Sequence, residues 1–140
     1  MSKNIILSDG ITSIKNSDFP TIDTDATLLF VPASCFFIQN YALRNLPELR
    51  VLWLPKSLTL ISESAFSGLD KLEAIVIHDF ETSSLGSVHY EYFDSITELF
   101  SKHPLDTYDA QHEIRKICKK NMILSYACQD RHIRANLSHI

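Results

Sequence analysis

A chain of 140 residues, with 45% hydrophobic and 21% charged residues, is long enough to bury the core of one ordinary globular domain. Its formal charge of −4 is mild, and the six basic side chains of residues 109–140 stand beside three acidic ones, so nucleic acid is not an expected partner. The three widely spaced cysteines, Cys35, Cys118 and Cys128, argue against a disulfide framework and favour a reducing compartment or buried thiols.

The N-terminus has too few apolar residues for a leader peptide or a membrane span. Only Ile5, Ile6 and Leu7 form an uninterrupted apolar run before Ser8 and Asp9. The sequence as it stands therefore predicts a cytoplasmic protein without membrane insertion. A leader trimmed from the sequence, or export or delivery to a host by a route that reads no N-terminal leader, is the alternative.

A tandem repeat occupies residues 29–77. The sequence Leu-Phe-Val-Pro-Ala-Ser, which begins at Leu29, recurs as Leu-Trp-Leu-Pro-Lys-Ser, which begins at Leu52, and the distance from Leu29 to Leu52 is the period of the repeat. The later apolar positions match at the same period without a gap: Ile38 with Ile61, Ala42 with Ala65, Leu43 with Phe66, Leu46 with Leu69 and Leu49 with Leu72. A fixed period of this kind indicates a solenoid, in which each repeat buries its apolar face against its neighbours.

A weaker copy precedes these two repeats over residues 4–27, at an offset one position longer than the period. Its matching apolar positions are Ile5, Leu7, Ile14, Phe19, Ile22 and Leu28. Asp25 falls where the full repeats have leucine, as at Leu49. Terminal repeats are commonly atypical because one side faces solvent, so we interpret this segment as an imperfect N-terminal repeat.

Each repeat is predicted to contain one short strand and one short helical turn. The spacing Leu49-x-x-Leu52-x-Leu54 places alternate residues on the inner side of a strand. Pro55 marks the end of that strand, because proline donates no backbone hydrogen bond. Residues 62–68 follow as a helical turn that Gly68 closes.

The segment of residues 54–77 resembles the BspA-like subclass of leucine-rich repeats, through its Leu-Pro-x-Ser and Ile-x-x-x-Ala-Phe elements. In the preceding repeat, Leu43 and Asn45 replace the Phe and Gly of that pattern, and Asn tolerates the left-handed backbone that Gly would supply. The resemblance implies a binding protein, like the adhesion and host-interaction proteins of bacteria and some protozoan parasites in that family. It carries no residue-level site.

Helical periodicity replaces the repeat after Ser83. The first predicted helix has Ser87 as its N-cap and Pro104 as its stop, and its apolar stripe contains Tyr92, Phe93, Ile96, Leu99 and Phe100. A second helix is predicted over residues 109–128, and a short third segment over residues 131–140.

These helices are interpreted as a cap on the last repeat strand, since an exposed sheet edge invites unwanted pairing. A separate helical surface for interaction or dimerisation is the alternative. The chain is thus divided into a leucine-rich repeat array over residues 1–79 and a helical cap over residues 80–140.

Signatures of catalysis are mostly absent from the sequence. The chain has only three glycines, no two of them close together, so a glycine-rich phosphate loop is not expected. The segment from His112 to Lys116 begins like a helical zinc-protease motif, but Lys116 occupies the place of the second ligand and would repel the metal. His78 and Asp79 are either an acid–base pair or, more commonly, part of a solvated turn.

Metal binding is equally weakly indicated. Cys118, Cys128 and His132 could supply three ligands, but structural zinc sites usually need a close pair of cysteines. Buried core thiols are the favoured interpretation of the two cysteines. We therefore predict no enzyme, no cofactor and no metal.

One column of the predicted strands points away from the repeat core and is wholly apolar: Ile6, Phe30, Trp53 and Val76. An exposed apolar stripe of this size needs an explanation. The first is a partner-binding face anchored by Trp53 and Phe30, with Arg50 at its rim, since aromatic residues and Arg dominate interface hot spots. The second is that the C-terminal helices fold over the stripe and make it core. The third is self-association as a homodimer.

The sequence thus predicts an α/β fold: a short leucine-rich repeat solenoid of two full repeats and one imperfect repeat, with a C-terminal helical cap. The predicted function is a scaffold that binds a protein partner of unknown identity through the concave strand face, at Phe30, Trp53, Val76, Arg50, Val51 and Glu73. A structural or oligomerisation module that self-associates through the same stripe or through the C-terminal helices is the alternative.

Overall fold

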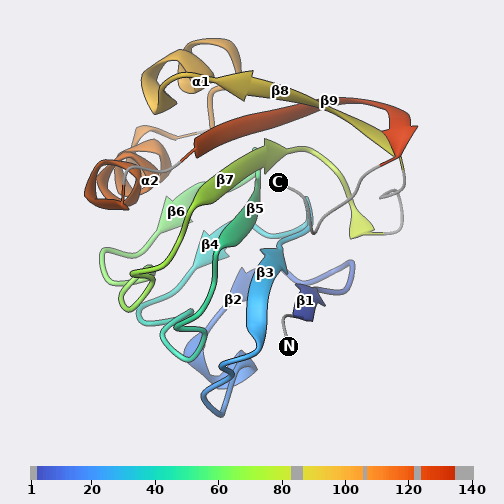
Figure 1. Cartoon of the computed structure of the whole chain (residues 1–140). Helices are drawn as coiled ribbons and strands as arrows, with labels where there is room; N and C mark the ends of the chain where they lie inside the picture. The colour runs from blue at the N-terminus through green and yellow to red at the C-terminus, as the bar shows by residue number, and fades with distance from the viewer. Residues whose placement is uncertain (1–2, 83–86, 106, 122–123, 135–140) are drawn as a thin grey trace.

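The computed structural model describes residues 3–82, 87–105, 107–121 and 124–134. Two sheets face each other across an apolar core (Figure 1). The larger sheet has six strands in the order β1 (Lys3–Ile6), β3 (Ala26–Phe30), β5 (Val51–Pro55), β7 (Ala74–His78), β9 (Leu124–Arg134) and β8 (Ser87–Phe93). The smaller sheet consists of β2 (Ser13–Ile14), β4 (Phe37–Ile38) and β6 (Leu60–Ile61).

The strand register confirms the predicted repeats. Strands β1, β3, β5 and β7 are parallel, and Leu29 of β3 pairs with Leu52 of β5, which in turn pairs with Ile75 of β7. On the other side of β3, Ile5 of β1 pairs with Leu29. Residues 4–27 are therefore a repeat of the same solenoid, as their weak match predicted.

The core lies between the two sheets, because each repeat sends alternate strand residues inward. Leu29, Leu52 and Ile75 from the larger sheet belong to the same buried cluster as Ile38 and Ile61 from the smaller one. No single repeat encloses this cluster, so the stacking of neighbouring repeats supplies the stability.

The segments predicted as helical turns are short hydrogen-bonded turns, and Gly68 closes one of them with a φ of +90°. The expectation of a left-handed backbone at Asn45 is wrong. Among the described non-glycine residues, a positive φ is found at Tyr41, where it is 55°, and not at Asn45. Asn45 instead holds two repeats together through its side chain, whose Nδ2 donates to the carbonyl oxygen of Phe19 at 2.6 Å.

The C-terminal part contains two helices, α1 (Ile96–Lys102) and α2 (Tyr108–Asn121), and it also contains two strands that were not expected. The first helix does not begin at Ser87, since residues 87–93 form β8. Its N-cap is Ser95, whose Oγ accepts a hydrogen bond from the backbone N–H of Glu98 at 3.1 Å. The second helix ends at Asn121 and not at Cys128.

The predicted third segment begins inside a strand, because residues 124–134 form β9; residues 135–140 lie outside the described part of the chain. Strand β9 runs parallel to β7, with Ile75 opposite Ser125, and antiparallel to β8, with Tyr92 opposite Tyr126. The edge of β7 is therefore covered by a strand.

The helices cover one end of the core instead of that edge (Figure 1). Leu99 and Phe100 of α1, and Ala110, Ile114 and Ile117 of α2, are buried in the same cluster as the repeat leucines. The division into two units at residue 79 stays a prediction. Strand β9, which belongs to the second of these units, lies in the same sheet as the repeat strands. Neither helix in the described residues is long and apolar enough to cross a membrane.

Candidate functional site

The predicted binding stripe is buried. Phe30, Trp53 and Val76 lie opposite one another in the register of the larger sheet, on the face turned away from the main core. All three are fully buried, whereas Ile6 at the edge of the sheet is 38% exposed. The expectation of an exposed apolar stripe is therefore wrong for these three residues and for the buried Val51.

His78, at the end of β7, forms part of the packing around this stripe. Its ring stacks on Phe30 with centroids 4.5 Å apart and lies 5.9 Å from the ring of Trp53 and 6.0 Å from that of Phe80. We call Phe30, Trp53, His78 and Phe80 the aromatic cluster. The buried residues of α1 and α2 belong to the main core, so the predicted folding of these helices over the stripe is not what the structure shows.

Both ring nitrogens of His78 are used in structural hydrogen bonds. Nδ1 accepts from the backbone N–H of Phe80 at 3.0 Å, so the proton is assigned to Nε2, which donates to the carbonyl oxygen of Val31 at 2.7 Å. Burial lowers the pKa of His78 to about 3, because a charged imidazole would lose its hydration. The expected solvated turn is wrong for this histidine, which is a neutral structural residue, although Asp79 is exposed.

The rim of the strand face remains accessible. Arg50 and Glu73 are exposed and form an ion pair, with 3.0 Å between Nη1 and Oε1. An exposed pair of this kind contributes at most about 1 kcal/mol, since water screens both charges. Binding of a partner at Arg50 and Glu73 stays a prediction, now without the neighbouring aromatic anchors.

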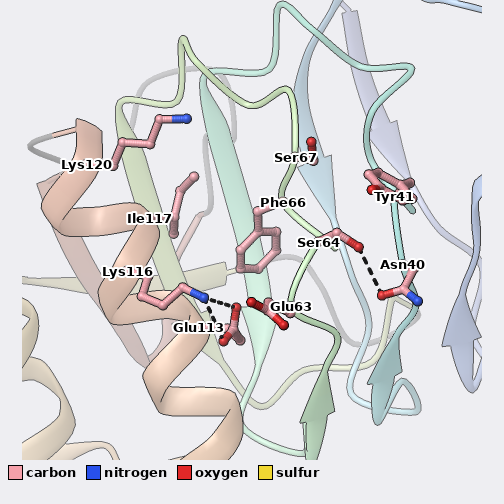
Figure 2. Close-up of a pocket in the computed structure, with 10 residues that line it drawn as sticks. All are labelled: Asn40, Tyr41, Glu63, Ser64, Phe66, Ser67, Glu113, Lys116, Ile117 and Lys120. Atoms are coloured by element: carbon pink, nitrogen blue, oxygen red, sulfur yellow. Dashed lines mark hydrogen bonds and ion pairs between the residues drawn. The ribbon is translucent and has the colours of Figure 1, made fainter.

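A groove of about 630 Å³ lies on another part of the surface, between α2 and the turns that follow β4 and β6 (Figure 2). We call it the α2 groove. Its lining combines apolar side chains with charged and amide groups, namely Asn40, Tyr41, Glu63, Ser64, Phe66, Ser67, Glu113, Lys116, Ile117 and Lys120. Sequence reasoning missed this site because its two sides come from residues 40–67 and 113–120, which no repeat or motif connects.

The repeat pattern explains the apolar wall of the groove. Ala65 is fully buried, and Phe66, the second residue of the Ala-Phe element, keeps 9% of its surface exposed at the groove. Ile117 of α2 stands across from it and is 6% exposed (Figure 2). Wall residues that are nearly buried are already ordered, so a ligand would not have to immobilise them.

Tyr41 is the most exposed aromatic residue of the groove. The residue is 47% exposed, and the guanidinium of Arg44 lies 5.5 Å from the ring centroid. Its backbone is held in the left-handed region, where its N–H donates to the carbonyl oxygen of Ser64 in the next repeat at 3.2 Å. A positive φ is uncommon for a bulky residue and costs of order 1 kcal/mol, and such residues gather at functional sites.

Helix α2 is attached to the repeats near both of its ends. Thr107 precedes its first turn and donates from Oγ1 to the carbonyl oxygen of Thr59 at 2.5 Å. Asn121, its last residue, donates from Nδ2 to the carbonyl oxygen of Leu69 at 2.7 Å. These two bonds fix the helical side of the groove relative to the turns.

The charges of the groove are unevenly compensated. Lys116 lies 3.0 Å and 3.2 Å from the two carboxylate oxygens of Glu113, whose side chain is only 12% exposed. Lys120 lies 3.1 Å from Asp70, which is outside the groove lining. Glu63 is exposed, and no residue of the described segments forms an ion pair with it.

The candidate nucleophiles and ligands do not assemble in the part of the chain that can be described. Burial raises the pKa of the Cys118 thiol to about 12 and that of Cys35 to about 11, so both thiols stay protonated. The side chains of Cys128 and His132 lie outside the described residues. Within them, no three His, Cys, Asp or Glu side chains are grouped to hold a metal ion.

A further contact joins the repeats to the C-terminal part. His103 accepts from Nζ of Lys56 at Nδ1, 3.2 Å away, and its Nε2 lies 3.6 Å from the carboxylate of Glu91 in β8. Burial lowers the pKa of His103, and the positive charge of Lys56 lowers it further. No sequence pattern indicates this contact, because Lys56 and His103 belong to different parts of the chain and share no motif.

Comparison with known proteins identifies a family and no individual relative. Neither a curated protein nor a solved structure matches the chain. A family model described as a BspA type leucine rich repeat region (6 copies) matches residues 2–100, which is more than half of the chain. The match extends the resemblance seen over residues 54–77 into the imperfect first repeat and beyond the last repeat strand. The chain belongs to the BspA-type leucine-rich repeat family.

Proposed function

We propose that this chain is a protein-interaction scaffold, not an enzyme, and that it binds its protein partner in the α2 groove. Leucine-rich repeat solenoids are commonly interaction scaffolds, which supports the general function. The half-exposed side chain of Tyr41, which lines the groove together with the apolar side chains of Phe66 and Ile117, carries the choice of surface. Aromatic residues in partly desolvated positions dominate the energetics of protein interfaces.

The strand face is the second candidate surface and is less favoured. Phe30 and Trp53 are buried, so a partner could reach them only after local opening. Arg50 and Glu73 are accessible, but each already neutralises the other. Self-association through either surface, as a homodimer, is the competing function.

Site-specific photo-cross-linking tests the proposed surface. A benzophenone amino acid replaces Tyr41 in one variant and Tyr92 of β8 in a matched control, since the two tyrosines are similarly exposed at 47% and 51%. We expect the Tyr41 variant to form a discrete cross-link to a second protein that the Tyr92 variant does not form. Phe66→Ala in the Tyr41 variant should weaken this product, because it removes the neighbouring apolar wall.

Two outcomes would contradict the proposal. Equal products from both positions would mean that the contact is not specific to the groove. A product with twice the mass of the chain would mean that the groove contacts a second copy, and light scattering of the unmodified protein over a range of concentrations would then show a dimer.

A further inference from the structure

We infer that the partner segment bound in the α2 groove presents a cationic side chain, arginine or lysine, to Glu63. This inference rests on the proposed function and specifies the chemistry of the occupant. It identifies Glu63 as the residue that determines charge specificity in the groove.

The pairing of charges within the groove supports this assignment. Of its two carboxylates, that of Glu113 is already neutralised by Lys116 through contacts to both oxygens. The remaining lysine, Lys120, is neutralised by Asp70. The carboxylate of Glu63 is therefore the uncompensated charge among the lining residues (Figure 2). A cation completes the pairing, whereas an anion would meet Glu63 beside lysines that are already paired.

The apolar side of the groove also fits such a side chain. Arginine and lysine place their methylene stems on apolar surfaces and keep their charged ends in contact with polar groups. Phe66 and Ile117 supply the apolar surface, and Glu63 lies at the same end of the groove as Glu113 (Figure 2).

The size of the groove favours a short peptide segment over a bare metal ion. A volume of about 630 Å³ is within the range of sites that bind several side chains or a small ligand. Lys116 already occupies the carboxylate of Glu113, so Glu63 is the one carboxylate of the lining left to hold a metal ion, whereas a single carboxylate suffices to pair with a guanidinium.

Titration of the full chain with two blocked peptides, followed by NMR of backbone amides, tests the inference. The peptides are acetyl-Leu-Arg-Leu-amide and the same peptide with citrulline, which keeps the shape of arginine and lacks its charge. The variants are Glu63→Gln and, as a matched control, Glu73→Gln, which removes the same charge from an exposed glutamate on the strand face.

We expect the arginine peptide to shift the amides of Tyr41, Phe66 and Ile117 and to bind about two- to fivefold more tightly than the citrulline peptide, the range of an exposed charge pair. Glu63→Gln should abolish this difference between the peptides, and Glu73→Gln should preserve it. The preference should also weaken as the salt concentration rises.

The outcomes separate this inference from the proposed function. If both peptides shift the groove amides equally, the cationic preference is wrong and the groove still stands as a binding surface. If Glu73→Gln abolishes the preference, the arginine of the peptide binds at the strand face and not at Glu63, which refutes the inference. If neither peptide shifts the groove amides, the inference is refuted, and the Tyr41 cross-linking experiment decides the proposed function independently.

Discussion

The buried imidazole of His78 should make the stability of this protein depend on pH in a predictable direction. Its pKa falls from the ordinary value of 6.5 to about 3 in the folded chain. Below pH 6.5 the unfolded state therefore binds a proton that the folded state does not bind. The free energy of unfolding must decrease as the pH falls through this window, and the contribution of His78 is constant above it.

The size of the effect follows from the width of that window. Each pH unit between the two pKa values changes the free energy of unfolding by about 1.4 kcal/mol. Between pH 7.5 and pH 5, the cost from His78 is therefore about 2 kcal/mol. This result requires only that the pKa of the folded state lies below about 4, which the full burial of the ring and its two hydrogen bonds support.

Urea unfolding at the two pH values, followed by the fluorescence of Trp53, measures this cost in the native protein and in His78→Gln. Glutamine keeps a donor for the carbonyl oxygen of Val31 and cannot bind a proton. The variant should be less stable near neutral pH, because it loses the ring stacking on Phe30. Its loss of stability on acidification should be smaller than that of the native protein by about 2 kcal/mol.

The comparison cancels the titration of every other group, since both proteins contain them. Val76→Ala, a change at a fully buried residue of the same sheet face that carries no titratable group, serves as the control and should keep the pH dependence of the native protein. Equal pH dependence of the native protein and His78→Gln would refute the reasoning. It would mean that His78 is protonated in the folded chain, or that its ring is not enclosed.

Three other changes test the repeats and their junction with the C-terminal part. Leu52→Ala, at a fully buried core position, should reduce the free energy of unfolding by about 2–5 kcal/mol in urea denaturation. A loss of less than about 1 kcal/mol would mean that the core is loosely packed around Leu52. Gly68→Ala should cost about 1–2 kcal/mol because of its positive φ, whereas Ser67→Ala beside it should be nearly neutral; equal melting temperatures would contradict the strained turn. Lys56→Met should raise the pKa of His103, measured by NMR, because one of its lowering influences is removed; an unchanged or lower pKa would mean that the two side chains are not in contact.

The repeats could be predicted because a constant period fixes which residues stack. A shift of one repeat brings Leu29 next to Leu52 and Leu52 next to Ile75, so the sequence alignment is also the strand register. Alternation along the strand also placed Phe30, Trp53 and Val76 on one face correctly. It could not reveal that this face is buried, because alternation gives the side of the sheet and not what packs against that side, where the rings of His78 and Phe80 lie.

The C-terminal strands and the groove could not be predicted for a related reason. Tyr92 and Phe93 begin the predicted helical stripe, yet they lie in β8, because pairing with β9, far along the chain, decides the structure of residues 87–93. The groove depends on the placement of α2 against turns near Tyr41 and Glu63. The left-handed backbone of Tyr41 has no signal in the sequence, since the residue is neither glycine nor asparagine.

The position of β9 determines when the larger sheet can be completed. This strand comes after β8 in the chain, yet it lies between β7 and β8, and among the described strands β8 pairs with β9 alone. During synthesis from the N-terminus, the repeat strands and β8 emerge first, and the edge of β7 stays open until residues 124–134 arrive. A ribosome-bound chain that stops before β9 should therefore expose a pairing edge, and a chaperone or a second nascent chain would have its longest opportunity to bind at that stage.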